Sequence, residues 1–192
     1  MDAINNSNKQ VLYITGRGGS LDKGLAVYLK SLSNGFEGIA LDVAFLRQPP
    51  DVQVEHIQSK ILEDSNRVII ANSYGAYLTL QAMVGLNSIK NSIVLLSPVL
   101  GVAQARDRMY MSRPPLTKRL QNSFFEGDLG RPKRLSVFIG KQDELFCKEQ
   151  INLLNDYFGK GAVTTLDGES HNLSHTIVKE IVSATLEVSN DN

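Results

Sequence analysis

Ser73 is the strongest candidate for a reactive residue in this sequence, because an apolar segment ends at it and a segment of helical character begins after it. The residues before it, 68–72, read VIIAN, and those after it, 74–78, read YGAYL. The small residues Ala71 and Gly75 allow neighbouring backbones to approach a tight strand-to-helix turn. A serine held at such a turn can act as a nucleophile. The alternative is an ordinary helix N-cap, a position that serine also favours.

A carboxylate and an imidazole follow the serine in chain order, each after a further segment typical of a strand. Asp143 comes just after the segment 135–140, LSVFIG. His171 lies in the polar loop 167–172, DGESHN, after the short apolar segment 162–166. A serine hydroxyl is a poor nucleophile until a base accepts its proton. His171 could be that base, and Asp143 could fix the imidazole tautomer.

Two other histidines are alternatives for the base. His175 lies four positions after His171 and would share a helix face with it if the helix began early. We favour His171, because it follows a strand directly in a small polar loop, whereas His175 is expected one turn into the helix. His56 lies before Ser73 in an amphipathic stretch and is expected on a helix surface.

Three other carboxylates compete with Asp143. Asp167 and Glu169 flank the histidine in its loop and are more simply interpreted as turn residues. Glu144 directly follows Asp143. We favour Asp143, because it lies just past the carboxyl end of its expected strand.

With serine, acid and histidine in this chain order, each after a segment typical of a strand, the chain resembles the α/β-hydrolase superfamily. In that superfamily the serine lies at a nucleophile elbow and is followed by the acid and then the histidine. The resemblance covers nearly the whole chain. It implies a serine hydrolase that cleaves a carboxylic ester or thioester of a small acyl substrate through an acyl-enzyme. The usual elbow pattern is G-x-S-x-G, and here Ala71 takes the place of the first glycine.

The resemblance also assigns a function to the glycine-rich segment 16–20, GRGGS, which follows the apolar segment 11–15. Such a loop aims a backbone N–H at the oxygen that becomes negative in the tetrahedral intermediate. The amides of Arg17 and Tyr74 would form this oxyanion hole, with Gly18 as an alternative to Arg17. Gly16 and Gly18 would also contact substrate. Thr15 replaces the histidine that the family commonly carries before this loop.

The elements that must position these residues alternate along the chain, as in repeated βαβ units. We expect strands near 11–15, 37–43, 67–72, 92–97, 135–140 and 162–166, and helices near 20–32, 53–64, 74–84, 145–158 and 173–188. This pattern predicts a three-layer α/β/α sandwich with a mostly or wholly parallel six-stranded sheet. The resemblance implies the order 2-1-3-4-5-6 and the absence of the family's first two strands. Ligands then bind where the strand order reverses.

The chain is expected to form one domain over residues 1–192, with a short lid-like insertion near 99–133. Pro114 and Pro115 prevent one continuous helix there. Basic residues outnumber acidic ones over 101–120, and Met109 and Tyr110 are candidates for substrate contact. An anionic, partly apolar substrate would suit this composition. The alternative is a solvated basic face whose apolar residues pack on the sheet.

Composition excludes several other classes. Twenty basic and twenty acidic residues cancel, so the chain has no overall field to bind nucleic acid. The single Cys147 and the absence of CxxC and HExxH patterns predict neither a disulfide nor a metal, and no cofactor is expected. No apolar run approaches the roughly 20 residues that span a bilayer. The start, MDAINN, lacks the features of a signal peptide, so we expect a cytoplasmic protein.

Two other functional classes remain as alternatives. A dinucleotide-binding domain would explain Gly16 and Gly18 after a first strand and Asp42 near the end of the second. Its fingerprint, however, requires a third glycine where this chain has Leu21. A binding or scaffold protein with the hydrolase fold but little turnover is the other alternative, and it predicts no reactive serine.

Overall fold

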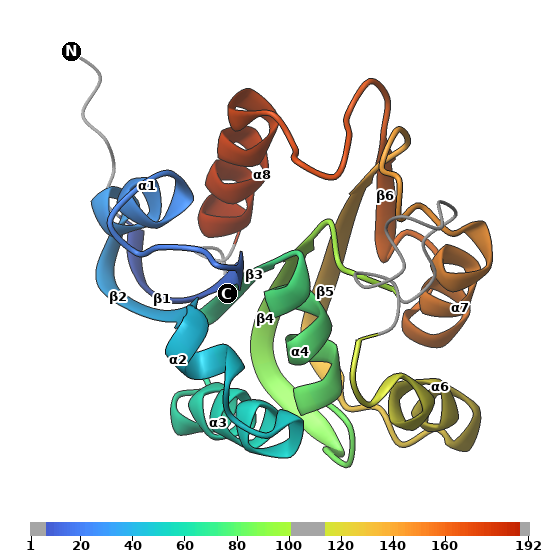
Figure 1. The fold of residues 1–192 in the computed structure, drawn as a ribbon. Helices are drawn as coiled ribbons and strands as arrows, with labels where there is room; N and C mark the ends of the chain where they lie inside the picture. The colour runs from blue at the N-terminus through green and yellow to red at the C-terminus, as the bar shows by residue number, and fades with distance from the viewer. Residues whose placement is uncertain (1–6, 101–113, 189–192) are drawn as a thin grey trace.

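The structure, a computed structural model, describes residues 7–100 and 114–188 and contains a six-stranded sheet in the order β2-β1-β3-β4-β5-β6 (Figure 1). Each neighbouring pair of strands is parallel. The strands are β1 (Ser7–Arg17), β2 (Ser33–Leu41), β3 (Val68–Asn72), β4 (Ser88–Leu96), β5 (Arg131–Gly140) and β6 (Val163–Leu166). The described helices are α1 (Leu25–Leu32), α2 (Val43–Leu46), α3 (Pro50–Glu63), α4 (Tyr74–Ala82), α6 (Thr117–Glu126), α7 (Lys148–Phe158) and α8 (His175–Val188).

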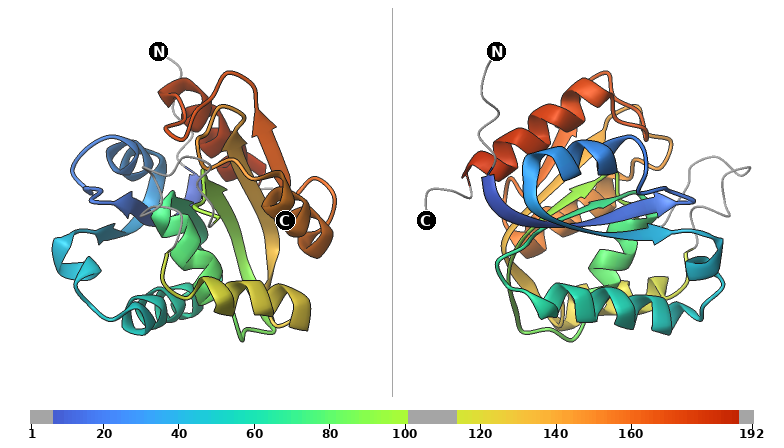
Figure 2. Two further views of the ribbon diagram at one scale, coloured as in Figure 1. Left: turned by 45° about the vertical axis from the view of Figure 1, so that its right-hand side comes forward. Right: turned by 90° about the vertical axis from the view of Figure 1, so that its left-hand side faces the viewer.

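Helices cover both faces of the sheet, which explains why its central strands are apolar at consecutive positions. In β3, Val68 and Ile70 join the core beneath α1 and α8, whereas Ile69 and Ala71 join the larger core beneath α3, α4, α6 and α7. Figure 2 shows these two helical layers on opposite sides of the sheet. The predicted three-layer architecture, the wholly parallel sheet and the strand order are therefore confirmed.

The main differences from the expected elements lie at strand ends and in the long connection after β4. β5 begins at Arg131 instead of near 135, because its polar first residues pair with β4 beyond the apolar core. Helix α6 lies within the segment expected to form a lid, and α2 is an additional short helix after β2. The substrate contacts expected of Met109 and Tyr110 concern positions outside the described residues.

Helix α4 holds the chain where it returns from that connection. The Tyr77 hydroxyl donates to the Pro115 carbonyl, and Gln81 Nε2 donates to the Leu116 carbonyl over 2.8 Å. Gln81 Nε2 also contacts the Tyr77 hydroxyl at 2.7 Å, and both side chains are buried. The start of α6 is thus fixed to the helix that follows Ser73.

Buried tyrosines make the stability of this fold sensitive to alkaline pH. Burial raises the pKa of Tyr13 to about 12, and burial also raises the pKa values of Tyr74 and Tyr77. The unfolded chain loses a phenolic proton near pH ~10, whereas the folded chain retains it until higher pH. The contribution of these neutral phenols to the free energy of unfolding should therefore be fully present below pH ~10. It should be lost as pH rises through their folded pKa values.

Denaturant titrations at pH 9 and pH 11 test this expectation. Tyr13→Phe removes one ionisable phenol, so its stability should fall less between the two pH values than that of the wild type. Parallel pH profiles for the two proteins would contradict a raised pKa at Tyr13.

No helix within 7–100 and 114–188 combines the length and apolar character that crossing a membrane requires.

Candidate functional site

Ser73 occupies a strained turn between β3 and α4. Its backbone angles are φ 51° and ψ −115°, a conformation that costs free energy for a residue with a Cβ. The Ser73 N–H donates to the Leu96 carbonyl over 2.8 Å, and the Ser73 carbonyl accepts from the Tyr77 N–H over 3.1 Å. These hydrogen bonds from the next strand and the following helix hold the serine in this conformation.

Close packing explains the small residues on either side of the turn. A Cβ atom on Gly75 would overlap the Thr15 carbonyl oxygen and approach Ile14 Cγ2 to 2.8 Å. Ala71 is completely buried between the sheet and α4, and its single methyl group is accommodated there. Gly75 therefore has a strict steric requirement, whereas the alanine at the first small position fits.

The side chains of Ser73, His171 and Asp143 form a continuous chain of hydrogen bonds. Ser73 Oγ lies 2.8 Å from His171 Nε2, and His171 Nδ1 lies 2.8 Å from Asp143 Oδ2. An Asp143 carboxylate accepts the Nδ1–H, which leaves Nε2 to accept the serine proton. The serine hydroxyl thus binds an imidazole and does not cap α4.

Asp143 is the most buried member of this chain, with a side chain only 1% exposed. It lies in the loop after β5, where its Oδ1 accepts from the Leu145 N–H over 2.7 Å. Both carboxylate oxygens are therefore bound, one to backbone and one to His171. The His171 side chain is 10% exposed, so the imidazole keeps some access to solvent.

Glu169 connects the loops that carry the acid and the histidine. Its backbone carbonyl accepts from the Gln142 N–H over 2.9 Å, and its carboxylate accepts from the backbone N–H and hydroxyl of Ser174 over 2.6 and 2.7 Å. A Cβ on Gly140 would overlap the Glu169 backbone, which shows how closely the two loops pack. The sequence alone suggested only a turn residue here, because the hydrogen bond to Gln142 depends on how two separate loops pack.

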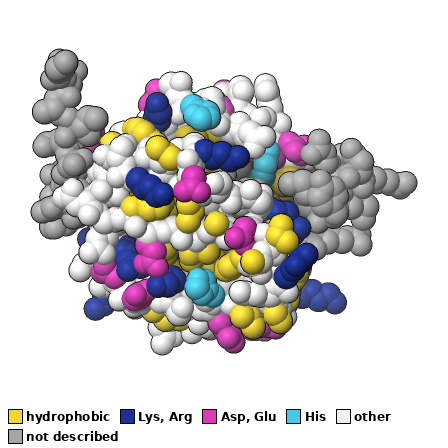
Figure 3. Space-filling view, turned by 60° about the vertical axis from the view of Figure 1, so that its left-hand side comes forward, with side chains coloured by type: hydrophobic (Ala, Val, Ile, Leu, Met, Phe, Trp, Pro, Cys, Tyr) yellow, Lys and Arg dark blue, Asp and Glu magenta, His cyan; other side chains and the backbone are white. Residues whose placement is uncertain are grey.

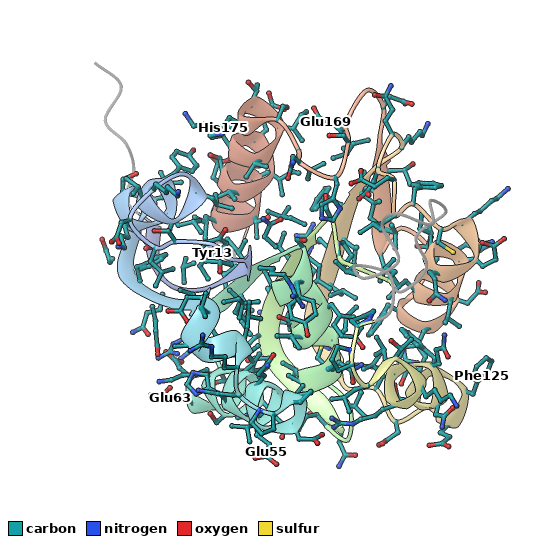
Figure 4. All side chains as sticks on the ribbon, in the orientation of Figure 1. Tyr13, Glu55, Glu63, Phe125, Glu169 and His175 are labelled. Atoms are coloured by element: carbon teal, nitrogen blue, oxygen red, sulfur yellow. The ribbon has the colours of Figure 1, made fainter. Side chains whose placement is uncertain are left out.

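The alternative acids and bases have other surroundings. Asp167 is exposed and forms an ion pair with Lys141 at 2.8 Å. His175 is exposed as the first residue of α8, and Figure 4 shows it at that end of the helix with Glu169 in the neighbouring loop. The exposed His56 contacts the edge of Phe45, with ring centroids 5.9 Å apart.

The carboxyl end of β1, where the glycine-rich segment begins, lies directly against the nucleophile, since β1 continues through Arg17 and does not end near residue 15 as expected. A Cβ on Gly16 would be 3.3 Å from Ser73 Cβ. Thr15 accepts from the Leu41 N–H at Oγ1 over 2.9 Å and donates to the Gly16 carbonyl, so the residue that replaces the family's histidine ties the loop to β2. This role of Thr15 was not foreseen from the sequence, because it depends on a partner in another strand.

The hydrogen bonds and contacts of this segment distinguish its two candidate oxyanion donors, Arg17 and Gly18. The Gly18 N–H donates to the Leu41 carbonyl over 2.8 Å, so it is already used within the fold. The Arg17 guanidinium lies 4.9 Å from the centre of the Tyr74 ring, which brings the loop and the start of α4 into contact. Among the described residues, no three His, Cys, Asp or Glu side chains lie close enough together to hold a metal ion.

Comparison with known proteins finds similarity in structure only. No family model matches the chain, and no curated protein matches it. Est1E from Butyrivibrio proteoclasticus superposes with a TM-score of 0.64 at 14% identity, covering 98% of this chain and 91% of its own. The esterase Est2 from Thermogutta terrifontis, with propionate bound, has a TM-score of 0.55 at 14% identity over 97% and 84%.

The ydeN gene product of B. subtilis has a TM-score of 0.59 at 16% identity, covering 92% of this chain and 97% of its own. At such low identities these similarities concern the fold. The parallel sheet, its strand order and these neighbours together show that the chain has the α/β-hydrolase fold. This is the fold that the resemblance of its sequence implied.

Proposed function

We propose that this protein is a serine hydrolase that cleaves carboxylic esters or thioesters of small acyl substrates through an acyl-enzyme intermediate. The observation that carries the proposal is the hydrogen-bonded chain from Ser73 through His171 to the buried Asp143. The esterase Est2 among the structural neighbours is consistent with ester hydrolysis.

In the proposed mechanism, Ser73 Oγ attacks the acyl carbon while its proton moves to His171 Nε2. The Asp143 carboxylate stabilises the imidazolium that forms. His171 then returns the proton to the alcohol or thiol as the bond to the acyl carbon breaks. Water then attacks the acyl carbon while His171 accepts its proton, the bond to Ser73 Oγ breaks as His171 returns that proton to the serine, and the acid is released.

The Arg17 and Tyr74 amides are proposed to stabilise the oxyanion. Arg17, the last residue of β1, pairs with Leu41 of β2, and the N–H that reaches the Leu41 carbonyl is that of Gly18, so the Arg17 N–H should point away from β2 and towards Ser73. The Tyr74 N–H belongs to the first turn of α4, where helix N–H groups lack intrahelical partners. Two such donors would stabilise charge as it develops.

Gly16 and Gly18 would border the acyl group through their Cα atoms. The 99–133 segment is proposed to form a lid within a single domain, and α6 is its described helical part. The buried end of this segment at α4 would keep the lid close to the nucleophile.

Labelling with a fluorophosphonate followed by intact-mass spectrometry tests the proposal. Wild type and Ser170→Ala, which changes an exposed serine near the histidine, should each gain one adduct. Ser73→Ala should gain none, because the probe requires an activated serine hydroxyl.

A folded wild-type protein that stays unlabelled would argue against the hydrolase and favour the scaffold alternative. An adduct that persists in Ser73→Ala would assign the nucleophile to another residue. Labelling of Ser73 would justify measuring turnover on panels of esters and thioesters.

A further inference from the structure

A cavity of about 770 Å³ lies between α1 and α8 over the carboxyl ends of the central strands. Its floor contains Tyr13 of β1 and the last residues of β3 and β4, Asn72 and Leu96. Tyr13 and Leu96 belong to the core on the α1 and α8 side, so the cavity occupies that face of the sheet. His171 forms part of its wall. The cavity therefore lies on the opposite face of the sheet from α6, whose buried residues join the other core.

The cavity combines a partly apolar lining with a cationic rim. Leu25, Tyr28 and Leu173 line it and are half-buried, whereas Lys23 and Lys179 line it and are exposed. Lys179 Nζ lies 5.2 Å from the centre of the Tyr28 ring, which places its charge beside the apolar wall. Among the described lining residues there is no aspartate or glutamate. Such a cavity suits a ligand with an apolar body and an anionic end.

Figure 3 views the molecule from the side of α1 and shows Lys and Arg side chains among hydrophobic ones on this face. Tyr13 and His175, both labelled in Figure 4, mark the floor and the exposed rim of the cavity. His175 is thus placed to contact a ligand here, although it is not bound to Ser73.

The position of His171 determines which part of a substrate would enter the cavity. In acyl transfer the imidazole returns its proton to the departing oxygen or sulfur, so the leaving group must lie beside His171. The cavity is lined by His171 but not by Ser73, Arg17 or Tyr74, where the acyl carbon and its oxygen would lie. It therefore adjoins the leaving-group side of the reaction.

We propose that this cavity binds the leaving group of the substrate, an alcohol or thiol with an apolar body and an anionic group that pairs with Lys23 and Lys179. The proposal rests on the proposed hydrolase function and adds the class of substrate. Asn72 is a polar side chain on the cavity floor directly before the nucleophile, and Gly16 lies close to its Nδ2. It is placed to hydrogen-bond the leaving group near the scissile bond.

Two matched pairs of acyl esters test the assignment. The first pair comprises the acetate esters of 3-(3-hydroxyphenyl)propionate and of its amide, which differ only in the charge of the leaving group. The second pair, monophenyl succinate and phenyl succinamate, differs only in the charge of the acyl part. At low ionic strength we expect kcat/KM to favour the anionic member of the first pair by about tenfold, with little discrimination in the second.

Variants of the two lysines locate the charge effect. The double variant Lys23→Ala/Lys179→Ala should reduce the preference in the first pair to about twofold or less. Lys90→Ala is the control, because Lys90 is also exposed but lies near the start of β4, at the other end of the sheet. It should retain the wild-type preference.

Three results would overturn the assignment: equal kcat/KM within the first pair, a charge preference confined to the acyl pair, or a preference that survives in the double lysine variant. Failure of the proposed function is distinguishable, because no ester would then be cleaved and no fluorophosphonate adduct would form. In that case, calorimetric titration of Ser73→Ala with 3-(3-hydroxyphenyl)propionate still tests the cavity. Binding that weakens in the lysine variant would support it, and absence of binding would refute it.

Discussion

Replacing Asp143 with asparagine is expected to lower kcat on an acyl ester by about 10⁴-fold while the protein stays folded. The present carboxylate accepts the Nδ1–H of His171 over 2.8 Å, and this hydrogen bond selects the tautomer whose Nε2 accepts the serine proton. An asparagine amide can donate to Nδ1 instead, which favours a hydrogen on Nε2 and leaves Ser73 without a base. The Leu145 N–H can still donate to the asparagine oxygen, so the loop should keep its conformation.

Steady-state kinetics on a chromogenic acetate ester, with circular dichroism to verify folding, measures this effect. Asp167→Asn is the matched control, because Asp167 is an exposed carboxylate in the histidine loop that pairs with Lys141. Its kcat should remain within about twofold of wild type, since surface ion pairs contribute little. A severe loss in Asp167→Asn together with a mild one in Asp143→Asn would reassign the acid.

Gly75→Ala is expected to cost about 3 kcal/mol of stability and to slow labelling of Ser73. The added methyl group would overlap the Thr15 carbonyl oxygen, which belongs to the backbone and cannot turn aside as a side chain could. Relief requires α4 to move away from β1, and this movement would displace the Tyr74 amide and alter the turn at Ser73. Stability and reactivity should therefore decline together.

Chemical denaturation and the rate of fluorophosphonate labelling measure the two effects. Gly85→Ala provides the comparison, because Gly85 has φ +81° but open space around its missing Cβ. That variant should lose only about 1 kcal/mol, the cost of a left-handed conformation for alanine, and should be labelled at the wild-type rate. Equal losses in the two variants would contradict a strict steric requirement at position 75, because Gly75 lies within α4 and is not among the glycines with a positive φ.

The fold was predictable from the sequence because its signals are local. The run VIIAN before Ser73 predicts a strand buried on both faces, and alternation of such runs with helical segments predicts a parallel sheet. The connection rules for βαβ units and the family resemblance then limited the strand order to the one observed. The polar first half of β5 was not predicted, because its residues belong to a strand only through pairing with β4.

The candidate triad was predictable in identity but not in geometry. Ser73, Asp143 and His171 each follow a strand, and parallel strands bring their carboxyl ends to one edge of the sheet. The hydrogen bond between Ser73 and His171 joins residues 98 positions apart, so its formation depends on how the two loops pack. Glu169 and Gly140 brace those loops through contacts that leave no periodic signal in the sequence.

The sequence by itself therefore determined the α/β architecture, the strained serine turn and the three candidate side chains proposed to carry out acyl transfer. Periodicity, small residues and chain order encode these features within short segments. Only the tertiary structure decided that Thr15 ties the glycine loop to β2, that the Gly18 N–H is already used, and that a cavity with a lysine rim adjoins His171. Each of these depends on the distance between segments remote in sequence, which is set by packing of the whole domain.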